Sequence, residues 1–132
     1  MYEIEAKDIK KSFGNLEVLK SISLQVNKGE VVAILGSSGS GKSTFLRSLI
    51  DLETVDGGSI SIAGENLCKD GVYVSKKEKA KALSKAGMVF QHFNLFPHMS
   101  IRKNLMCAPL LNKQGTKEEI SRLAESTLAK VG

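Results

Sequence analysis

The chain has 132 residues, of which 42% are hydrophobic and 25% charged, and its net charge is +5 from 19 basic and 14 acidic side chains. This length suits about one domain, and this composition is typical of a globular chain rather than a disordered one. The apolar runs are far shorter than the ~20 residues that span a bilayer, and the charged N-terminus MYEIEAKDIK lacks the apolar stretch of a secretory signal. Two cysteines, Cys68 and Cys107, make no disulfide framework, so we expect reduced thiols and no zinc site.

The basic balance permits an anionic partner but does not select one. Much of the positive charge lies in residues 75–85, SKKEKAKALSK, which is either a solvated helix face or a surface for electrostatic contact with a partner. Aromatic residues make up only 5% of the chain, and tryptophan is absent. Stacking on single-stranded nucleic acid is therefore not indicated, and no nucleic-acid partner is expected.

Alternating apolar and polar residues predict antiparallel strands in the first thirty residues. Ile4 and Ala6 alternate with glutamates, and Ile22, Leu24 and Val26 alternate with polar residues. This period of two is typical of a half-buried strand. The glycine of Phe-Gly-Asn at 13–15 marks the turn between the two strands.

Residues 31–35, VVAIL, differ because they are apolar on both faces, which predicts a strand buried inside a parallel sheet. A glycine- and serine-rich stretch follows at 36–41. From Lys42 onward, apolar residues recur at helical spacing at Phe45, Leu46, Leu49 and Ile50. The sequence thus predicts a buried strand that passes through a glycine-rich loop into a helix.

The rest of the chain alternates short elements with turns. We expect a turn at 56–58, a short strand at 59–63, a turn at 63–66 and a polar helix at 75–84. A short buried strand at 87–90 and a loop at 91–100 follow. The last two elements are a helix at 101–108, which Pro109 stops, and a helix that begins at the capping box Thr116–Glu119.

The glycine-rich loop carries the strongest chemical signal. Residues 36–43, GSSGSGKS, match the pattern G-x-x-x-x-G-K-[ST], the Walker A motif. Glycines let backbone N–H groups approach phosphate oxygens, and the N-terminus of the following helix directs its positive dipole end at the same phosphates. Lys42 is placed to neutralise β- and γ-phosphate charge, and the hydroxyl of Ser43 suits Mg²⁺. The loop therefore predicts a nucleoside phosphate and Mg²⁺ as ligands. The same loop serves kinases, GTPases, motors and transport ATPases, so by itself it leaves the reaction open.

The segment LKSISLQVNKGEVVAILGSSGSGKSTFLRSL resembles the ATP-binding cassette (ABC) proteins that drive membrane transporters. GMVFQHFNLFPHMS resembles the Q-loop segment of the same family. Within the family, the residues of both segments are most similar to those of the ATPase subunits of polar amino-acid importers. The resemblance implies an α/β P-loop NTPase (RecA-like) fold, with ATP and Mg²⁺ as ligands. It divides the chain into an antiparallel β part at 1–30, the P-loop core at 31–91 and the start of a helical subdomain at 92–132.

The resemblance also implies roles for individual residues. Phe13 matches the aromatic residue that stacks on adenine, and Val18 would touch the same ring; alternatively, Phe13 caps the sheet at a turn. Gln91 matches the Q-loop glutamine that reaches Mg²⁺ and the attacking water, unless it is a plain surface residue. The expected nucleotide-binding set is Phe13, Val18, Gly36, Ser37, Ser38, Gly39, Ser40, Gly41, Lys42, Ser43 and Thr44, with Ser43 and Gln91 as metal ligands and Gln91 as the catalytic residue.

The implied partners are membrane-spanning permease subunits and a second ATPase subunit. The segment Phe93–Met99 (FNLFPHM) would dock on the permease, whereas core packing is the alternative for its apolar residues. His92 and His98 are read as loop residues. The implied location is peripheral, on the cytoplasmic face of the plasma membrane.

Family motifs that follow the Q-loop do not occur in residues 1–132: the LSGGQ signature, the Walker B strand ending in Asp with its catalytic Glu, and the switch His. We therefore expect a truncated domain. The sequence leaves three readings open, namely a transport-coupled ATPase subunit, a nucleotide-binding fragment without turnover, and a non-transport ABC protein.

Overall fold

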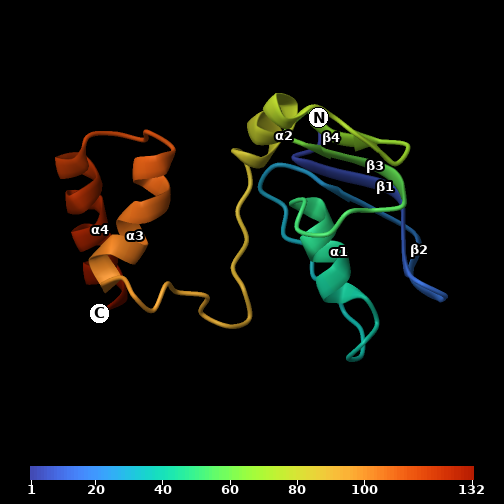
Figure 1. The fold of residues 1–132 in the computed structure, drawn as a ribbon, viewed down its shortest axis with the longest axis horizontal. Coiled ribbons are helices and arrows are strands. Elements are labelled where there is room, and N and C mark those ends of the chain that lie inside the picture. Colours follow the sequence, from blue (N-terminus) through green and yellow to red (C-terminus); the bar gives the residue numbers. More distant parts are fainter. The chain divides into compact units, whose positions relative to one another are not determined.

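Five strands form one antiparallel sheet in the order β2-β1-β3-β4-β5 (Figure 1). The computed structural model describes all of residues 1–132, which fold as two compact units, Met1–Val89 and Phe90–Gly132. The sheet lies wholly in the first unit. Its strands are β1 (Ile4–Phe13), β2 (Leu16–Val26), β3 (Gly57–Ile62), β4 (Glu65–Lys69) and β5 (Val72–Tyr73).

The hairpin of β1 and β2 confirms the first two predicted strands, and it contains a bulge that the sequence pattern did not predict. Ala6 and Ile9 are both buried, although an odd spacing of three residues places side chains on opposite faces of a regular strand. Asp8 between them has a φ of 51°, and the pairing with β2 shifts register at this point. The bulge returns Ile9 to the core face, and the amide of Asp8 donates to Ser23 Oγ at 2.9 Å.

Two tight turns shape the other edge of the sheet. Ala63 and Gly64, with φ of 49° and 83°, join β3 to β4, and Asp70 and Gly71, with φ of 50° and 80°, join β4 to β5. Positive φ at both central residues is typical of the two-residue turns that match the twist of a hairpin. The predicted turn at 63–66 is thus shorter than expected, because Glu65 already belongs to β4.

Two predicted buried strands are wrong. Residues 31–35 and 87–90 make no sheet pairing in the structure, and Val31 and Leu35 are 95% and 90% exposed. An apolar run forms a buried strand only where neighbouring strands hydrogen-bond to it and cover both faces. The sheet of this chain is antiparallel throughout and offers these segments no neighbour.

The predicted helix after the glycine-rich loop is confirmed as α1 (Lys42–Leu49), which covers one face of the sheet (Figure 1). Phe45 and Leu49 are buried against the sheet, and the buried hydroxyl of Ser48 donates to the carbonyl of Thr44 at 2.7 Å. The core joins side chains of the helix, the sheet and the loop after α1: Ala6, Ile9, Leu19, Phe45, Leu49, Val55, Ile60, Leu67 and Cys68.

The lysine-rich segment forms α2 (Lys76–Leu83), as predicted, and a capping box of Ser75 and Glu78 opens it. Lys76 and Lys77 are exposed, as expected for a solvated face. Lys81 and Lys85 pair with Glu65 at 3.2 and 3.5 Å. The hydrogen bond and charge of Lys81 hold the pKa of Glu65 below its usual range.

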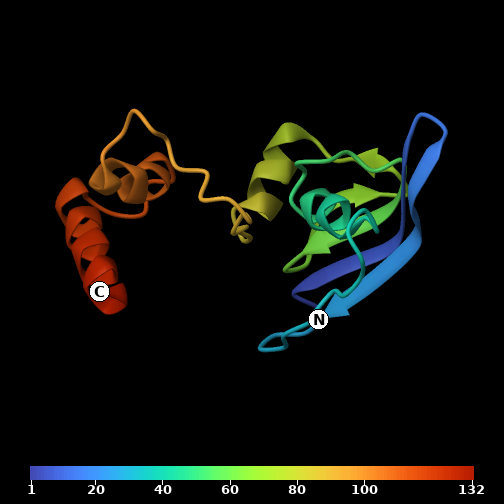
Figure 2. The ribbon, with the colours of Figure 1, turned by 90° about the horizontal axis from the view of Figure 1, so that it is seen from below.

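The second unit contains two helices that pack on each other, α3 (Ile101–Leu111) and α4 (Lys117–Val131) (Figure 2). Met106 of α3 packs on Ile120 and Ala124 of α4. The predicted capping box is confirmed, since Glu119 N donates to Thr116 Oγ1 at 3.2 Å. No helix in the chain combines the length and the hydropathy that crossing a membrane requires.

The expected stop of α3 at residue 108 is wrong, because Pro109 lies inside the helix. Proline removes the hydrogen bond from its own amide to the carbonyl four residues earlier, and its ring crowds that carbonyl. Both costs fall in the last turn of the helix, because α3 ends two residues after Pro109.

Tyr73 supplies a pH-dependent contribution to the stability of the first unit. Its hydroxyl accepts a hydrogen bond from the Val55 amide at 2.9 Å, and burial raises the pKa of Tyr73 to about 12. An unfolded tyrosine titrates near pH ~10. The folded state therefore holds the proton more tightly, and this contribution is complete below pH ~10 and decreases as pH rises toward 12.

We expect the unfolding midpoint of the unaltered chain to fall more steeply between pH 10 and 12 than that of Tyr73→Phe, as measured by thermal unfolding in both proteins. Tyr73→Phe also leaves the Val55 amide without its partner, which lowers its midpoint at every pH. Parallel curves for the two proteins across this range would contradict the assignment.

Candidate functional site

The glycine-rich loop at 36–41 leads directly into the first turn of α1. Ser40 N donates to Ser37 O at 3.2 Å, which closes a turn, and Gly39 and Gly41 have φ of 79° and 95°. Gly41 is the N-cap of α1, and no side chain caps the first amide groups of the helix. Free amide groups at a helix N-terminus, together with the positive end of its dipole, favour an anion.

Glycine is required at Gly41, where φ is 95° and β2 approaches closely. A Cβ on Gly41 would lie 3.1 Å from Val18 Cγ1 and 3.2 Å from Leu19 Cδ2 of β2. A Cβ on Gly36 would lie 2.7 Å from Ser40 Oγ, a contact that rotation of the Ser40 side chain can relieve. The loop is therefore pressed against β2, and Val18 is part of its wall.

The ammonium group of Lys42 lies inside the loop. Its Nζ donates to the carbonyl of Gly36, to that of Ser37 at 2.7 Å and to Ser40 Oγ at 3.3 Å. None of these acceptors is charged, and Lys42 makes no ion pair with a carboxylate. Phosphate oxygens are stronger acceptors for an ammonium group than neutral carbonyls, so an incoming phosphate can replace them.

Phe13 and Val18 lie on the hairpin of β1 and β2, and Val18 lies against Gly41 of the loop. Phe13 ends β1 and pairs with Leu16 across the turn, and Val18 follows on β2. Phe13 is 46% exposed, so its ring is available to a flat ligand rather than enclosed by the sheet. The Nζ of Lys11 lies 5.0 Å from the centroid of the ring.

The two expected metal ligands lie in different units. Ser43 is exposed in the first turn of α1, whereas Gln91 is exposed in the unit Phe90–Gly132. No group of three or more His, Cys, Asp or Glu side chains in the chain could hold a metal ion. Mg²⁺ is commonly bound by one or two protein oxygens together with phosphate oxygens, and the free hydroxyl of Ser43 fits that use.

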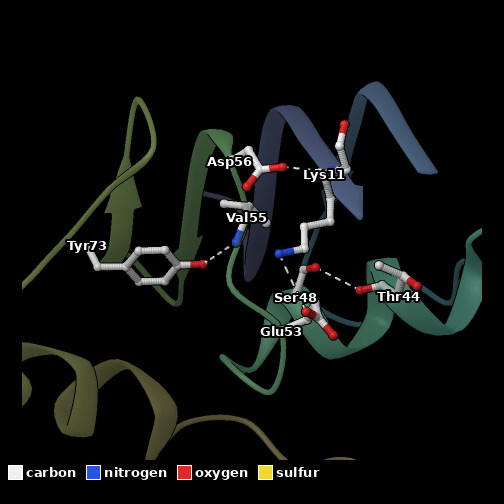
Figure 3. A network of polar contacts seen from close by, with 8 residues as sticks. Lys11, Thr44, Ser48, Glu53, Val55, Asp56 and Tyr73 are labelled. Carbon is white, nitrogen blue, oxygen red and sulfur yellow. Dashed lines mark hydrogen bonds and ion pairs between the residues drawn. The ribbon is translucent and has the colours of Figure 1, made fainter. Parts of the chain in front are cut away.

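A polar network between the loop after α1 and β1 was not predicted from the sequence (Figure 3). Lys11 Nζ pairs with Glu53 Oε1 at 3.5 Å, and the Ser12 amide donates to Asp56 Oδ2 at 2.7 Å. The Asp56 amide in turn donates to Lys10 O at 2.8 Å. These contacts fasten the loop after α1 to the end of β1. The sequence predicted only the turn at 56–58 in this region. The contacts themselves join residues far apart in the chain, so no local pattern indicates them.

The chain belongs to the ABC transporter family, whose sequence profile matches residues 19–132. It is 46% identical over 129 residues to the arginine transport ATP-binding protein ArtM of Bacillus subtilis, a match that covers 98% of this chain and 52% of ArtM. It is also 46% identical over 131 residues to the histidine/lysine/arginine/ornithine transport ATP-binding protein HisP of Escherichia coli, covering 95% of this chain and 51% of HisP.

Among solved structures, the ATP-binding cassette MJ0796, in a dimeric post-hydrolysis state with ADP and Pi, superimposes with a TM-score of 0.80. The two sequences are 28% identical, and the match covers 96% of this chain and 56% of the MJ0796 chain. The family and the fold class expected from the sequence are therefore confirmed. The chain spans about half the length of the curated relatives that it matches.

Proposed function

We propose that this chain is an ATP-binding part of an importer for polar amino acids, in which ATP binding and hydrolysis drive transport. The observation that carries the nucleotide-binding part of the proposal is the loop at 36–43. It combines glycines at positive φ, a helix start without a side-chain cap and a lysine without a carboxylate partner. The relatives support the substrate class, since ArtM and HisP are named for transport of basic amino acids.

Within this proposal, the backbone amides of Gly36–Thr44 and the ammonium of Lys42 bind the phosphates. Ser43 holds Mg²⁺, which when bound neutralises phosphate charge. Phe13 and Val18 bind adenine, and Gln91 orients the attacking water through its amide. Three of these residues have a free or exchangeable group for the proposed role: the ring of Phe13 and the hydroxyl of Ser43 are exposed, and Lys42 contacts only neutral acceptors.

We also propose that Phe93–Met99 docks on the membrane-spanning permease subunits, which places the protein at the cytoplasmic face of the plasma membrane. The alternative of core packing is wrong for this segment, because Phe93 is 95% exposed and Leu95 and Phe96 are also exposed. An apolar surface of this kind favours a protein partner. A second ATPase subunit is the remaining proposed partner.

The test is to produce the protein with the permease subunits of a basic amino-acid importer and to measure copurification. Phe93→Ser with Phe96→Ser is expected to reduce copurification about 10-fold or more, because the variant lacks two aromatic side chains whose apolar surface would be buried on binding. Leu123→Ser, at another exposed apolar residue of the same unit, is the control and should leave copurification unchanged. Unchanged copurification of the double variant would contradict the docking proposal.

A further inference from the structure

We propose that Lys11 positions the ring of Phe13 for a purine base, and that Glu53 holds Lys11 in place. The inference rests on the proposed function, in which Phe13 stacks on adenine. Lys11 and Glu53 do not touch the nucleotide in this account; they act through the Phe13 ring.

The geometry places the charge of Lys11 over the aromatic face. Its Nζ is 5.0 Å from the ring centroid, within the range of a cation–π contact. The Lys11 side chain is only 13% exposed, although it lies at the surface end of a strand. Its stem is therefore held by packing, and the ammonium group has few alternative positions. Phe13 is still 46% exposed beside this contact, so part of its ring remains accessible to a flat ligand.

The ammonium group of Lys11 makes a second contact, with the carboxylate of Glu53. Glu53 Oε1 lies 3.5 Å from Nζ, and the Glu53 side chain is itself 26% exposed. Glu53 belongs to the loop that follows α1, and Asp56 of the same loop binds the backbone of β1 through Ser12 and Lys10 (Figure 3). A carboxylate on this fastened loop thus holds the ammonium group at the ring.

This arrangement links the base site to the phosphate site. The phosphate-binding loop opens α1 at Lys42, and the loop with Glu53 follows its other end. The Phe13 ring is connected through Lys11 and Glu53 to the element that carries the phosphate loop. A ring held in this way loses less freedom when a base stacks on it, so the base is bound more tightly. A polyphosphate without a base does not contact the ring, so the ring does not affect its affinity.

The experiment compares Mg·ATP with Mg·tripolyphosphate, a ligand that lacks the base, by calorimetric titration of the chain. Lys11→Met keeps the aliphatic stem and removes the charge. We expect it to weaken Mg·ATP about twofold to fivefold, the size of a partly exposed cation–π contact, and to leave Mg·tripolyphosphate unchanged. Glu53→Gln should have a smaller effect in the same direction. Lys11→Arg keeps the cation and should restore ATP binding.

Lys10→Met is the matched control, because the neighbouring residue is an exposed lysine that contributes only its carbonyl to the network. In a Phe13→Leu background, Lys11→Met should have no further effect. A thermal unfolding midpoint for each variant establishes that it folds, and Lys11→Arg keeps the test decisive if Lys11→Met is unstable.

Three results overturn the inference. Equal weakening of both ligands would mean that Lys11 acts only through its charge on the phosphates. Unchanged ATP binding in Lys11→Met, while Phe13→Leu weakens it, would leave the proposed function intact and refute the role of Lys11. Absence of ATP binding in the unaltered chain would refute the proposed nucleotide site together with this inference.

Discussion

Alanine at Lys42 is expected to weaken Mg·ATP binding about 10- to 100-fold, because one charged hydrogen-bonding group contributes roughly 1.5–3 kcal/mol. In the structure, the Lys42 ammonium lies within the loop on the carbonyls of Gly36 and Ser37. Exchange of these neutral acceptors for charged oxygens favours the bound state, and alanine removes that gain. Loss of the lysine also removes a positive charge from the loop that we propose binds the polyphosphate.

The measurement is a calorimetric titration of Mg·ATP into the unaltered chain and Lys42→Ala. Lys28→Ala removes an exposed lysine outside the loop and serves as the control for net charge. Its affinity should equal that of the unaltered chain. Equal affinity of Lys42→Ala and Lys28→Ala would show that the loop does not bind the phosphates.

Alanine at Phe45 is expected to lower the free energy of unfolding by about 3–5 kcal/mol, the usual cost of removing a buried aromatic side chain. Phe45 is 4% exposed and connects α1 to the core formed with β1 and β2. The loss also reaches the phosphate loop, since α1 is the element that this loop opens. We therefore expect both a lower unfolding midpoint and weaker Mg·ATP binding.

Leu46→Ala, at the next position of the same helix, is the control, because Leu46 is exposed. Denaturant unfolding of the two variants should separate them by at least about 2 kcal/mol. Similar midpoints would contradict the packing of α1 on the sheet through Phe45.

Elements with a local signal were predictable from the sequence. The alternation in β1 and β2, the helical spacing after Lys42 and the capping box of Thr116 with Glu119 all depend on residues close together in the chain. The phosphate loop was predictable for the same reason, because its glycines, its lysine and its serine are contiguous.

Features that depend on distant neighbours were not predictable in this way. The apolar runs at 31–35 and 87–90 have the composition of buried strands, but their structure is set by the availability of pairing partners. The bulge at Asp8 depends on Ser23 of the opposite strand. The turn at Asp70 and Gly71 did carry a local signal, since Asp-Gly between short strands is typical of a hairpin.

The same distinction applies to the site. The roles of Phe13 and Gln91 came from family resemblance, and they remain predictions. The contacts of Lys11 with Phe13 and Glu53 could not be predicted, because Glu53 meets β1 only after the chain has passed through β2 and α1.

The most direct test of the nucleotide site is the shift of backbone amide resonances as Mg·ATP is added to isotopically labelled chain. The account predicts saturable shifts that are largest at Gly39, Gly41, Lys42 and Ser43, where the amides of the loop and of the first turn of α1 meet the phosphates. It also predicts smaller shifts at Phe13 and Val18. Saturable shifts elsewhere with the loop amides unmoved, or no shifts at millimolar Mg·ATP, would contradict it.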